Sequence, residues 1–353
     1  MQIKNNTQFL VNATPQFIRS DATILTVMVK GTFTLNDQGQ PMVPAPEQHP
    51  IVWGDELYEG ESTCVRLEGE LLPFKPKSDV LVIGDAMAPG GKPVEVLPVS
   101  VRVGAVSKEL VVFGNRYWKK DSGMPPKMTQ PEPFTLMEVS YQKAFGGFDL
   151  DSGTVCLENP TGMGIIDEKA KVLTQDVALP NVENPEALIQ SWQDRPEPVS
   201  FGVVGRGWPS RLALMGTYDE QWQEERAPDP PEDFNSAFYN CASSDLQSDT
   251  YFLGNELVEV ANMSPTGAIA CHLPGLTFSA DAVIAQSDSE DVEELMNPDL
   301  PTQTTTLGLN LDTVTLFPNT QVATLIWRGF TYVKGFAAAE VRSVEVNMDI
   351  PSA

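Results

Sequence analysis

Apolar and polar residues alternate along the N-terminal third of the chain, which is the pattern of a strand with one buried face. The clearest alternation lies between Ile24 and Leu35. The apolar face holds Leu25, Val27, Val29, Phe33 and Leu35, and the polar face holds Thr26, Lys30, Thr32 and Thr34. The segment NDQGQP follows with residues typical of a turn, so this strand is predicted to begin a hairpin.

Three further segments of the first 120 residues are predicted to be strands. VSVRVG, at 99–104, repeats the alternation, and the apolar run ELVVFG, at 109–114, follows it. Asp79–Gly84 is a short apolar segment that leads toward a Pro-Gly-Gly turn. Residues 1–120 are therefore predicted to form a β meander or sandwich.

The same turn raises the question of a phosphate-binding loop in LVIGDAMAPGGKP, residues 81–93. Such a loop needs a glycine five positions before its Gly-Lys pair and a hydroxyl residue directly after it. Ala86 occupies the first position and Pro93 the second. The stretch is therefore interpreted as a strand and a turn.

Prolines are frequent between residues 121 and 305, where they remove backbone donors and fix φ. This region is predicted to consist of ordered loops with a few short helices. The best helical candidate is NPEALIQSWQD, at 184–194, with Asn184 as the cap and Pro185 at the first position. The acidic run SDSEDVEELMNPD, at 287–299, is interpreted as a solvated helix or a mobile loop.

Strand patterning returns in residues 306–353. Asp312–Phe330 contains two alternating runs around the turn FPNT and is predicted to form a hairpin that packs on the main body. VRSVEVNMDI, at 341–350, is predicted to be one more strand. The expected fold is mainly β: an antiparallel, β-sandwich-like body, a loop-rich middle and few short helices, with regions 1–120, 121–305 and 306–353 integrated in one domain.

Charge and cysteine content narrow the classes of partner and compartment. The chain has 353 residues, with 23 basic and 48 acidic side chains, so its formal net charge is −25. This charge repels phosphate backbones and anionic lipids, which argues against nucleic acid and membrane partners. The four cysteines form no CxxC pair, and the segment MQIKNNTQFL lacks the pattern of an export signal. We therefore expect a cytoplasmic protein.

The sequence offers little recognisable catalytic chemistry. His49 and His272 are the only histidines, and no GxSxG motif or ligand-spaced cysteine set is present, so we expect neither a metal nor another cofactor. Two carboxylate pairs beside aromatic residues could serve a glycosidase. They are Asp219 with Glu220 and Glu232 with Asp233. A carboxylate-dependent hydrolase of polysaccharide or peptidoglycan is therefore one alternative function.

Eleven short motifs occur in an order that resembles one protein family. They are VMVKGTF, KPKSDVLVIGDAMAPGGKP, VVFGNRYW, SYQKAFGG, ENPTGMG, LPNVENP, RGWPSR, GTYDEQW, PEDFNSAFYNCA, GNELVEVANMSP and HLPG. Together they resemble the domain-of-unknown-function 2169 family, which occurs with bacterial type VI secretion systems. The resemblance runs from about Val27 to Gly275, and VTLFPNTQVATLIWRG is similar to the family's closing segment.

This resemblance implies an adaptor or chaperone without enzymatic activity. Its partners would be a secreted effector and a PAAR-like spike-tip protein, onto which the effector is loaded before secretion. A structural component of the secretion apparatus is a further alternative.

Candidate partner-binding residues lie between 208 and 250, and residues 218–250 hold nine acids against one base, Arg226, with aromatic residues interleaved. Aromatic and arginine side chains dominate interface hot spots, and acids suit a basic partner. The candidates are Trp208, Arg211, Tyr218, Asp219, Trp222, Glu224, Glu225, Asp229, Phe234, Phe238 and Tyr239. Core packing is the alternative interpretation of the aromatic residues, and a buried ion pair is the alternative for Arg206 and Arg211.

Overall fold

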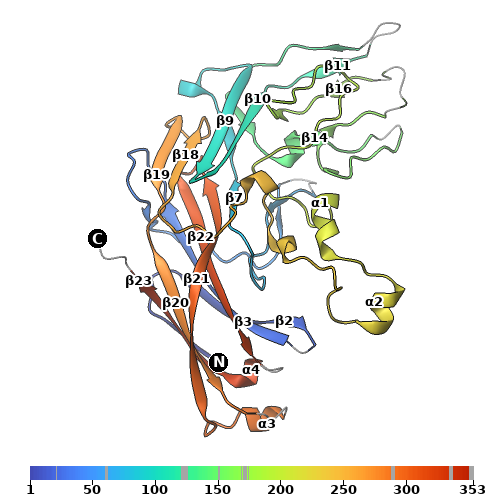
Figure 1. Ribbon diagram of the computed structural model, residues 1–353. Helices are drawn as coiled ribbons and strands as arrows, with labels where there is room; N and C mark the ends of the chain where they lie inside the picture. The colour runs from blue at the N-terminus through green and yellow to red at the C-terminus, as the bar shows by residue number, and fades with distance from the viewer. Residues whose placement is uncertain are drawn as a thin grey trace.

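A large sheet of nine strands forms the body of the protein (Figure 1). The computed structural model describes residues 1–20, 22–59, 63–120, 126–149, 152–167, 169, 173, 175–287, 291–333 and 337–349. The sheet order is β1-β23-β20-β21-β22-β3-β2, with β4 added beside β3 and β7 beside β21. Its strands are β1 (Gln2–Asn5), β2 (Leu10–Arg19), β3 (Ala22–Thr34), β4 (Val43–Pro44), β7 (Asp79–Val82), β20 (Thr277–Ala285), β21 (Thr302–Phe317), β22 (Val322–Val333) and β23 (Val341–Asp349). Neighbours are antiparallel except for β1 with β23 and β7 with β21.

A second sheet of five antiparallel strands lies above the long strands in Figure 1. Its order is β17-β10-β9-β18-β19. The strands are β9 (Val96–Val103), β10 (Val106–Phe113), β17 (Val182–Glu183), β18 (Leu257–Ala261) and β19 (Ala268–His272). One continuous hydrophobic core joins the inward side chains of both sheets. The fold is therefore mainly β and sandwich-like, as the alternation predicted.

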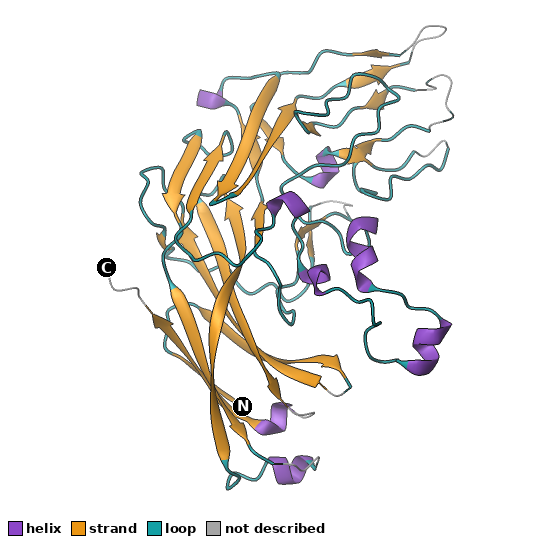
Figure 2. Cartoon of the chain, viewed as in Figure 1, coloured by secondary structure: helices purple, strands orange, loops and turns teal. Residues whose placement is uncertain are grey.

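Short elements complete the chain, and the helices are only one or two turns long (Figure 2). The small strands are β5 (Glu56–Leu57), β6 (Val65–Leu67), β8 (Asp85–Met87), β11 (Tyr117–Lys119), β12 (Lys127–Met128), β13 (Leu136–Glu138), β14 (Phe145–Gly146), β15 (Met163–Gly164) and β16 (Val177–Ala178). The α-helices are α1 (Pro209–Leu212), α2 (Glu220–Glu225), α3 (Val292–Leu295) and α4 (Ala337–Glu340), and 3₁₀ turns span Pro89–Gly91, Tyr141–Lys143, Ala213–Met215, Ser236–Tyr239 and Ser244–Leu246. Across the described residues, no helix combines the length and apolarity that a membrane crossing requires.

The predicted strands at both ends of the chain are confirmed. β3 and β7 occupy the segments expected for them, and β3 turns back into the short β4. The expected C-terminal hairpin is formed by β21 and β22, and β23 is the last strand. The hairpin lies inside the large sheet, because β21 pairs with β20 and β22 pairs with β3.

The expectation of an exposed polar face on β3 is wrong. Thr26, Lys30 and Thr32 are buried, as are the apolar residues between them. The Thr26 hydroxyl donates to the carbonyl of Pro73, and the Lys30 ammonium donates to the carboxylate of Glu70. Chain segments that follow β4 therefore cover this face, and they supply the hydrogen-bond partners that its polar side chains need.

The helix expected at 184–194 is also absent, and local side chains explain why. The Asn184 side chain accepts from the amide of Glu186, as a cap would. The amide of Ile189 then donates to the carboxylate of Glu183, and the amides of Gln190 and Ser191 donate to Asp194. These backbone amides donate to side chains and not to the backbone carbonyls that a helix would offer them. The segment therefore forms turns. In the acidic run, α3 makes a single turn, and residues 288–290 lie outside the described residues.

Four aromatic rings fill the concave side of the large sheet. The ring of Trp327 on β22 lies 4.7 Å from that of Phe278 on β20 and 6.1 Å from that of Phe33 on β3, measured between centroids. Phe9 contacts both phenylalanines, at 5.2 Å from Phe33 and 5.8 Å from Phe278. Rings on strands that are not direct neighbours meet, so the sheet curls around this cluster.

Trp327→Ala is expected to lower the free energy of unfolding by about 3–5 kcal/mol, because it leaves a large cavity in the cluster. The Trp327 side chain is 2% exposed, whereas Trp53 is 70% exposed. Trp53→Ala is the matched control and should change the free energy by no more than about 0.5 kcal/mol. Guanidinium-induced unfolding measures both variants. Equal losses in the two variants would contradict the assignment of Trp327 to the core.

Candidate partner-binding surface

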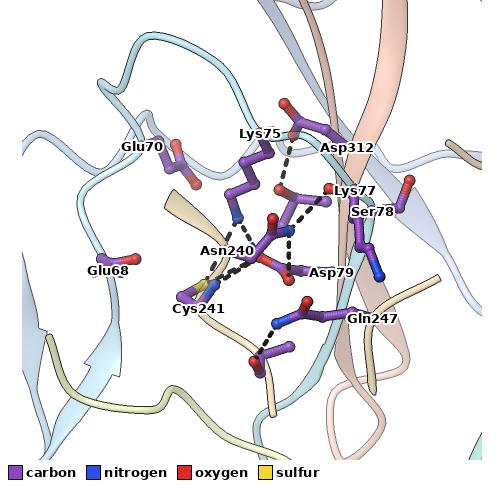
Figure 3. Close-up of polar contacts among 12 residues, drawn as sticks. Glu68, Glu70, Lys75, Lys77, Ser78, Asp79, Asn240, Cys241, Gln247 and Asp312 are labelled. Carbon is purple, nitrogen blue, oxygen red and sulfur yellow. Dashed lines mark hydrogen bonds and ion pairs between the residues drawn. The ribbon is translucent and has the colours of Figure 1, made fainter. Parts of the chain in front are cut away.

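A buried ion pair holds the covering segments on the large sheet. The Lys75 ammonium lies 2.7 Å from a carboxylate oxygen of Asp79, and the two side chains are 3% and 0% exposed (Figure 3). Asp79 also accepts from the side-chain amide of Asn240 and the backbone amide of Cys241, both at 2.9 Å. Burial alone would lower the pKa of Lys75, but the charges of Asp79, Cys241 and Asp312 together outweigh it and raise that pKa, so the ammonium stays charged. These contacts therefore fix residues 75–79 to residues 240–241, and they meet at Asp79, the first residue of β7.

A bulge in β21 creates a second buried pair. The ladder between β21 and β22 shifts between Leu311 and Thr313, which leaves Asp312 without a partner strand residue. The Asp312 carboxylate binds the guanidinium of Arg328 on β22, and both side chains are buried. Arg328 also donates to the carbonyl of Glu70 at 3.0 Å. The pair ties the covering segment to the centre of the sheet.

Arg211 forms a buried ion pair, as one of the two interpretations of RGWPSR proposed, but its partner is far away in the sequence. A guanidinium nitrogen of Arg211 lies 2.8 Å from the Glu68 carboxylate, and Arg206 binds the same oxygen. The Nε of Arg211 donates to the carbonyl of Phe238 at 2.9 Å. Arg211 therefore positions the chain near Phe238.

Trp208 is buried, and it packs edge-on against Tyr141 with 4.8 Å between ring centroids. Among the candidates for partner contact, Trp208 and Arg211 thus lie in the interior.

Three of the remaining aromatic candidates, Phe234, Phe238 and Tyr239, form part of a continuous row of rings, here called the aromatic row. Its members are Phe238, Phe234, Tyr239, Phe74, Phe330 and Tyr332. Phe74 links the two halves, with its ring 5.7 Å from Tyr239 and 5.1 Å from Phe330 between centroids. The last ring contact, between Phe330 and Tyr332, is 6.1 Å.

The aromatic row runs from the covered part of the molecule to its surface. Phe74, Phe234, Phe238 and Tyr239 are partly buried. Phe330 is 37% exposed and Tyr332 is 68% exposed. The row therefore ends in an uncovered aromatic shelf on β22, on the same face as Arg328.

Residues 217–233, here called the acidic arm, project to one side of the sheets and carry α2 (Figure 1). Three acids of the arm hold it together. Asp219 caps α2 by accepting from the amide of Trp222 at 2.8 Å, and Asp233 accepts from both the amide and the hydroxyl of Thr217. Asp229 accepts from the amide and the hydroxyl of Ser20, which joins the arm to the hairpin of β2 and β3. These bonds with Thr217 and Ser20 lower the pKa of Asp233 and of Asp229.

The other candidates on the arm are presented to solvent. Glu224 and Glu225 are exposed at the end of α2, as is Glu220 at its start. Tyr218 is exposed and packs on Trp222 with 4.6 Å between ring centroids. The arm therefore offers carboxylates and an aromatic pair. Asp219 and Asp233, proposed as hydrolase carboxylates, accept hydrogen bonds from the arm's own chain.

Three members of the aromatic row were not among the candidates from the sequence. Phe330 is the last residue of the predicted hairpin, and Tyr332 stands at i+2 just beyond it, so their common face could have been read by extending the period of two. Phe74 could not be found in this way, because its contacts come from residues that are far away in the chain.

Asp79→Asn is expected to lower the free energy of unfolding by about 3–5 kcal/mol, because it leaves the Lys75 charge buried without its carboxylate. The matched control is Asp176→Asn, which breaks an ion pair of 2.6 Å with Lys119 on the surface. Water and salt screen such a pair, so the control should unfold like the parent protein. Guanidinium-induced unfolding compares the variants, and equal midpoints would refute a stabilising role for Asp79.

Comparison with known proteins gives one family. The model of the family described as "Uncharacterized protein conserved in bacteria (DUF2169)" matches residues 20–328. No curated protein and no solved structure matches significantly. The matched range contains the buried ion pairs and the acidic arm, and it ends just before Phe330. Since the match covers most of the chain, the protein belongs to the DUF2169 family.

Proposed function

We propose that the protein is a type VI secretion adaptor or chaperone, which binds a secreted effector, a PAAR-like spike-tip protein or both in the cytoplasm for loading. The observation that carries the proposal is the aromatic row, which leads from the interior to the exposed Phe330 and Tyr332. The resemblance to proteins that occur with type VI secretion supplies the class of partner.

The aromatic shelf has the properties of an interface centre. Aromatic side chains supply large contact areas at low cost in conformational entropy, and they are enriched among hot-spot residues. The shelf continues into rings that are already packed, so a partner meets an ordered surface. Such preorganisation lowers the entropic cost of binding.

The ion pairs beneath the row account for this order. Phe74 directly precedes Lys75, and Tyr239 directly precedes Asn240, while Arg211 binds the carbonyl of Phe238. The buried network thus fixes the backbone at three of the six rings. We infer that the network acts on binding through the position of these rings.

The acidic arm suits a basic partner. Its exposed glutamates are long and screened by water, so their main effect is to steer the partner during encounter. Burial of apolar surface at the aromatic shelf supplies the larger share of the affinity. The two surfaces therefore contribute to different steps of binding.

Phe330→Ala combined with Tyr332→Ala is expected to weaken partner binding at least about thirtyfold, which corresponds to the loss of one hot-spot side chain of about 2 kcal/mol. The protein would be co-expressed with a candidate toxin and a candidate PAAR-like protein chosen from its neighbouring genes, and their retention would be measured in a pull-down. Leu157→Ala is the control, because Leu157 is 63% exposed outside the row. If the unaltered protein retains neither partner, the adaptor function is wrong.

Glu224→Lys combined with Glu225→Lys is expected to slow association and to weaken its dependence on salt, while dissociation changes less. Asp229 is left unchanged, since its bonds to Ser20 hold the arm. Glu95→Lys with Glu109→Lys alters the net charge equally at other exposed positions and is the control. Surface plasmon resonance at several salt concentrations measures the rates. Equal slowing by both pairs would mean that net charge, and not the arm, steers the partner.

A further inference from the structure

A cavity of about 900 Å³ lies on the polar face of the large sheet, away from the acidic arm. Its floor comes from β3 and β22, through Lys30, Val322 and Thr324. Its walls come from residues within 49–59 and 66–70, from Ile83–Asp85 and from Glu138. This volume falls in the range of about 300–1,000 Å³ that is typical of ligand sites.

Two carboxylates meet in the wall of this cavity. Asp85 on β8 and Glu138 on β13 are directly opposite each other in an antiparallel pair. Like charges in such positions repel each other. Glu138 accepts from the side chains of Ser140 and Gln142, which keeps its carboxylate in place. Burial and the Glu138 charge raise the pKa of Asp85.

Lys30 and Arg66, two of the basic side chains that line the cavity, are engaged with other acids. Lys30 lies 2.5 Å from Glu70, and Arg66 lies 3.9 Å from Glu56. Tyr58 lines the same space, and its hydroxyl is buried without a hydrogen-bond partner among the described residues. The carboxylate pair and this hydroxyl form a polar wall that lacks a compensating cation.

We propose that this cavity binds an ammonium or guanidinium group between Asp85 and Glu138. The repulsion across the strand pair is relieved when a cation lies between the carboxylates, and the Tyr58 hydroxyl gains an adjacent polar group. In the adaptor, the group is a lysine or arginine side chain of the bound protein, and this part of the proposal rests on the proposed function.

The removal of these charges should leave the fold intact. A carboxyl whose pKa is raised on folding destabilises the folded protein above its unfolded pKa of 3.8, and the full cost is present above the folded pKa. Asp85→Asn removes this cost, so it should raise stability at pH 7 and have little effect at pH 3. A stable variant is therefore available for the binding test.

The test uses capped amino acids as probes at low ionic strength. Nα-acetyl-lysine methylamide and its arginine counterpart are titrated into the ¹⁵N-labelled protein, and the amide shifts of Asp85, Glu138 and Tyr58 are followed. Asp85→Asn with Glu138→Gln should weaken binding at least about tenfold, because the cation loses charged hydrogen-bond acceptors. Glu109→Gln, an exposed acid on β10, is the control and should leave binding unchanged.

Three results would overturn the cation site: no shifts at these residues, equal binding of the uncharged Nα-acetyl-norleucine methylamide, or equal affinity in the double variant. Titration with 1,4-diaminobutane and a pull-down with the neighbouring partners separate the two sources of the cation. Loss of the partner in the double variant supports a protein side chain. Tighter binding of the diamine with full partner retention would assign the site to a free diamine. The titrations need no partner, so they stand even if the adaptor function fails.

Discussion

The buried pair of Lys75 and Asp79 is the interaction on which the arrangement of the covering layer depends. Asp79 begins β7, the strand that pairs in parallel with β21. The same carboxylate binds Asn240 and Cys241, which come from the other covering segment. One side chain thus joins the sheet, the preceding covering segment at Lys75 and the distant segment at 240–241. Neither partner can be removed alone without leaving a buried charge or unpaired donors.

The same physical requirement explains why both faces of β3 are buried. A polar strand face can lie inside a protein only when each of its groups finds a partner. The Glu70 carboxylate accepts a hydrogen bond from Lys30, and the Glu70 backbone carbonyl accepts one from Arg328. The loop that carries Glu68 and Glu70 therefore covers this face of the sheet and supplies hydrogen bonds that water would otherwise make. Its order comes from these polar bonds, since the loop contains little regular secondary structure.

The aromatic row and the acidic arm are two separate surfaces that are held in different ways. The aromatic row stands on segments that the buried pairs fix, whereas the acidic arm is joined to the sheet by Asp229 and Ser20. The cavity with Asp85 and Glu138 lies elsewhere on the covering layer. A partner that contacts all three would be held by apolar contact at one site and by charge at the others.

The sequence by itself determined several of the long strands, because local alternation and turn residues are read from neighbouring positions. It did not predict β18, β19 and β20, which lie in the region expected to consist of loops and short helices. It predicted β3, β7 and the hairpin of β21 and β22, and it placed aromatic residues and acids in 208–250. It failed at 184–194, where Glu183 and Asp194 capture backbone donors across several residues. The tertiary structure alone decided that Arg211 pairs with Glu68, that Phe74 bridges Tyr239 and Phe330, and that Asp85 faces Glu138. Each of these contacts joins residues more than fifty positions apart, and periodicity within one segment carries no information about which distant segment will cover it.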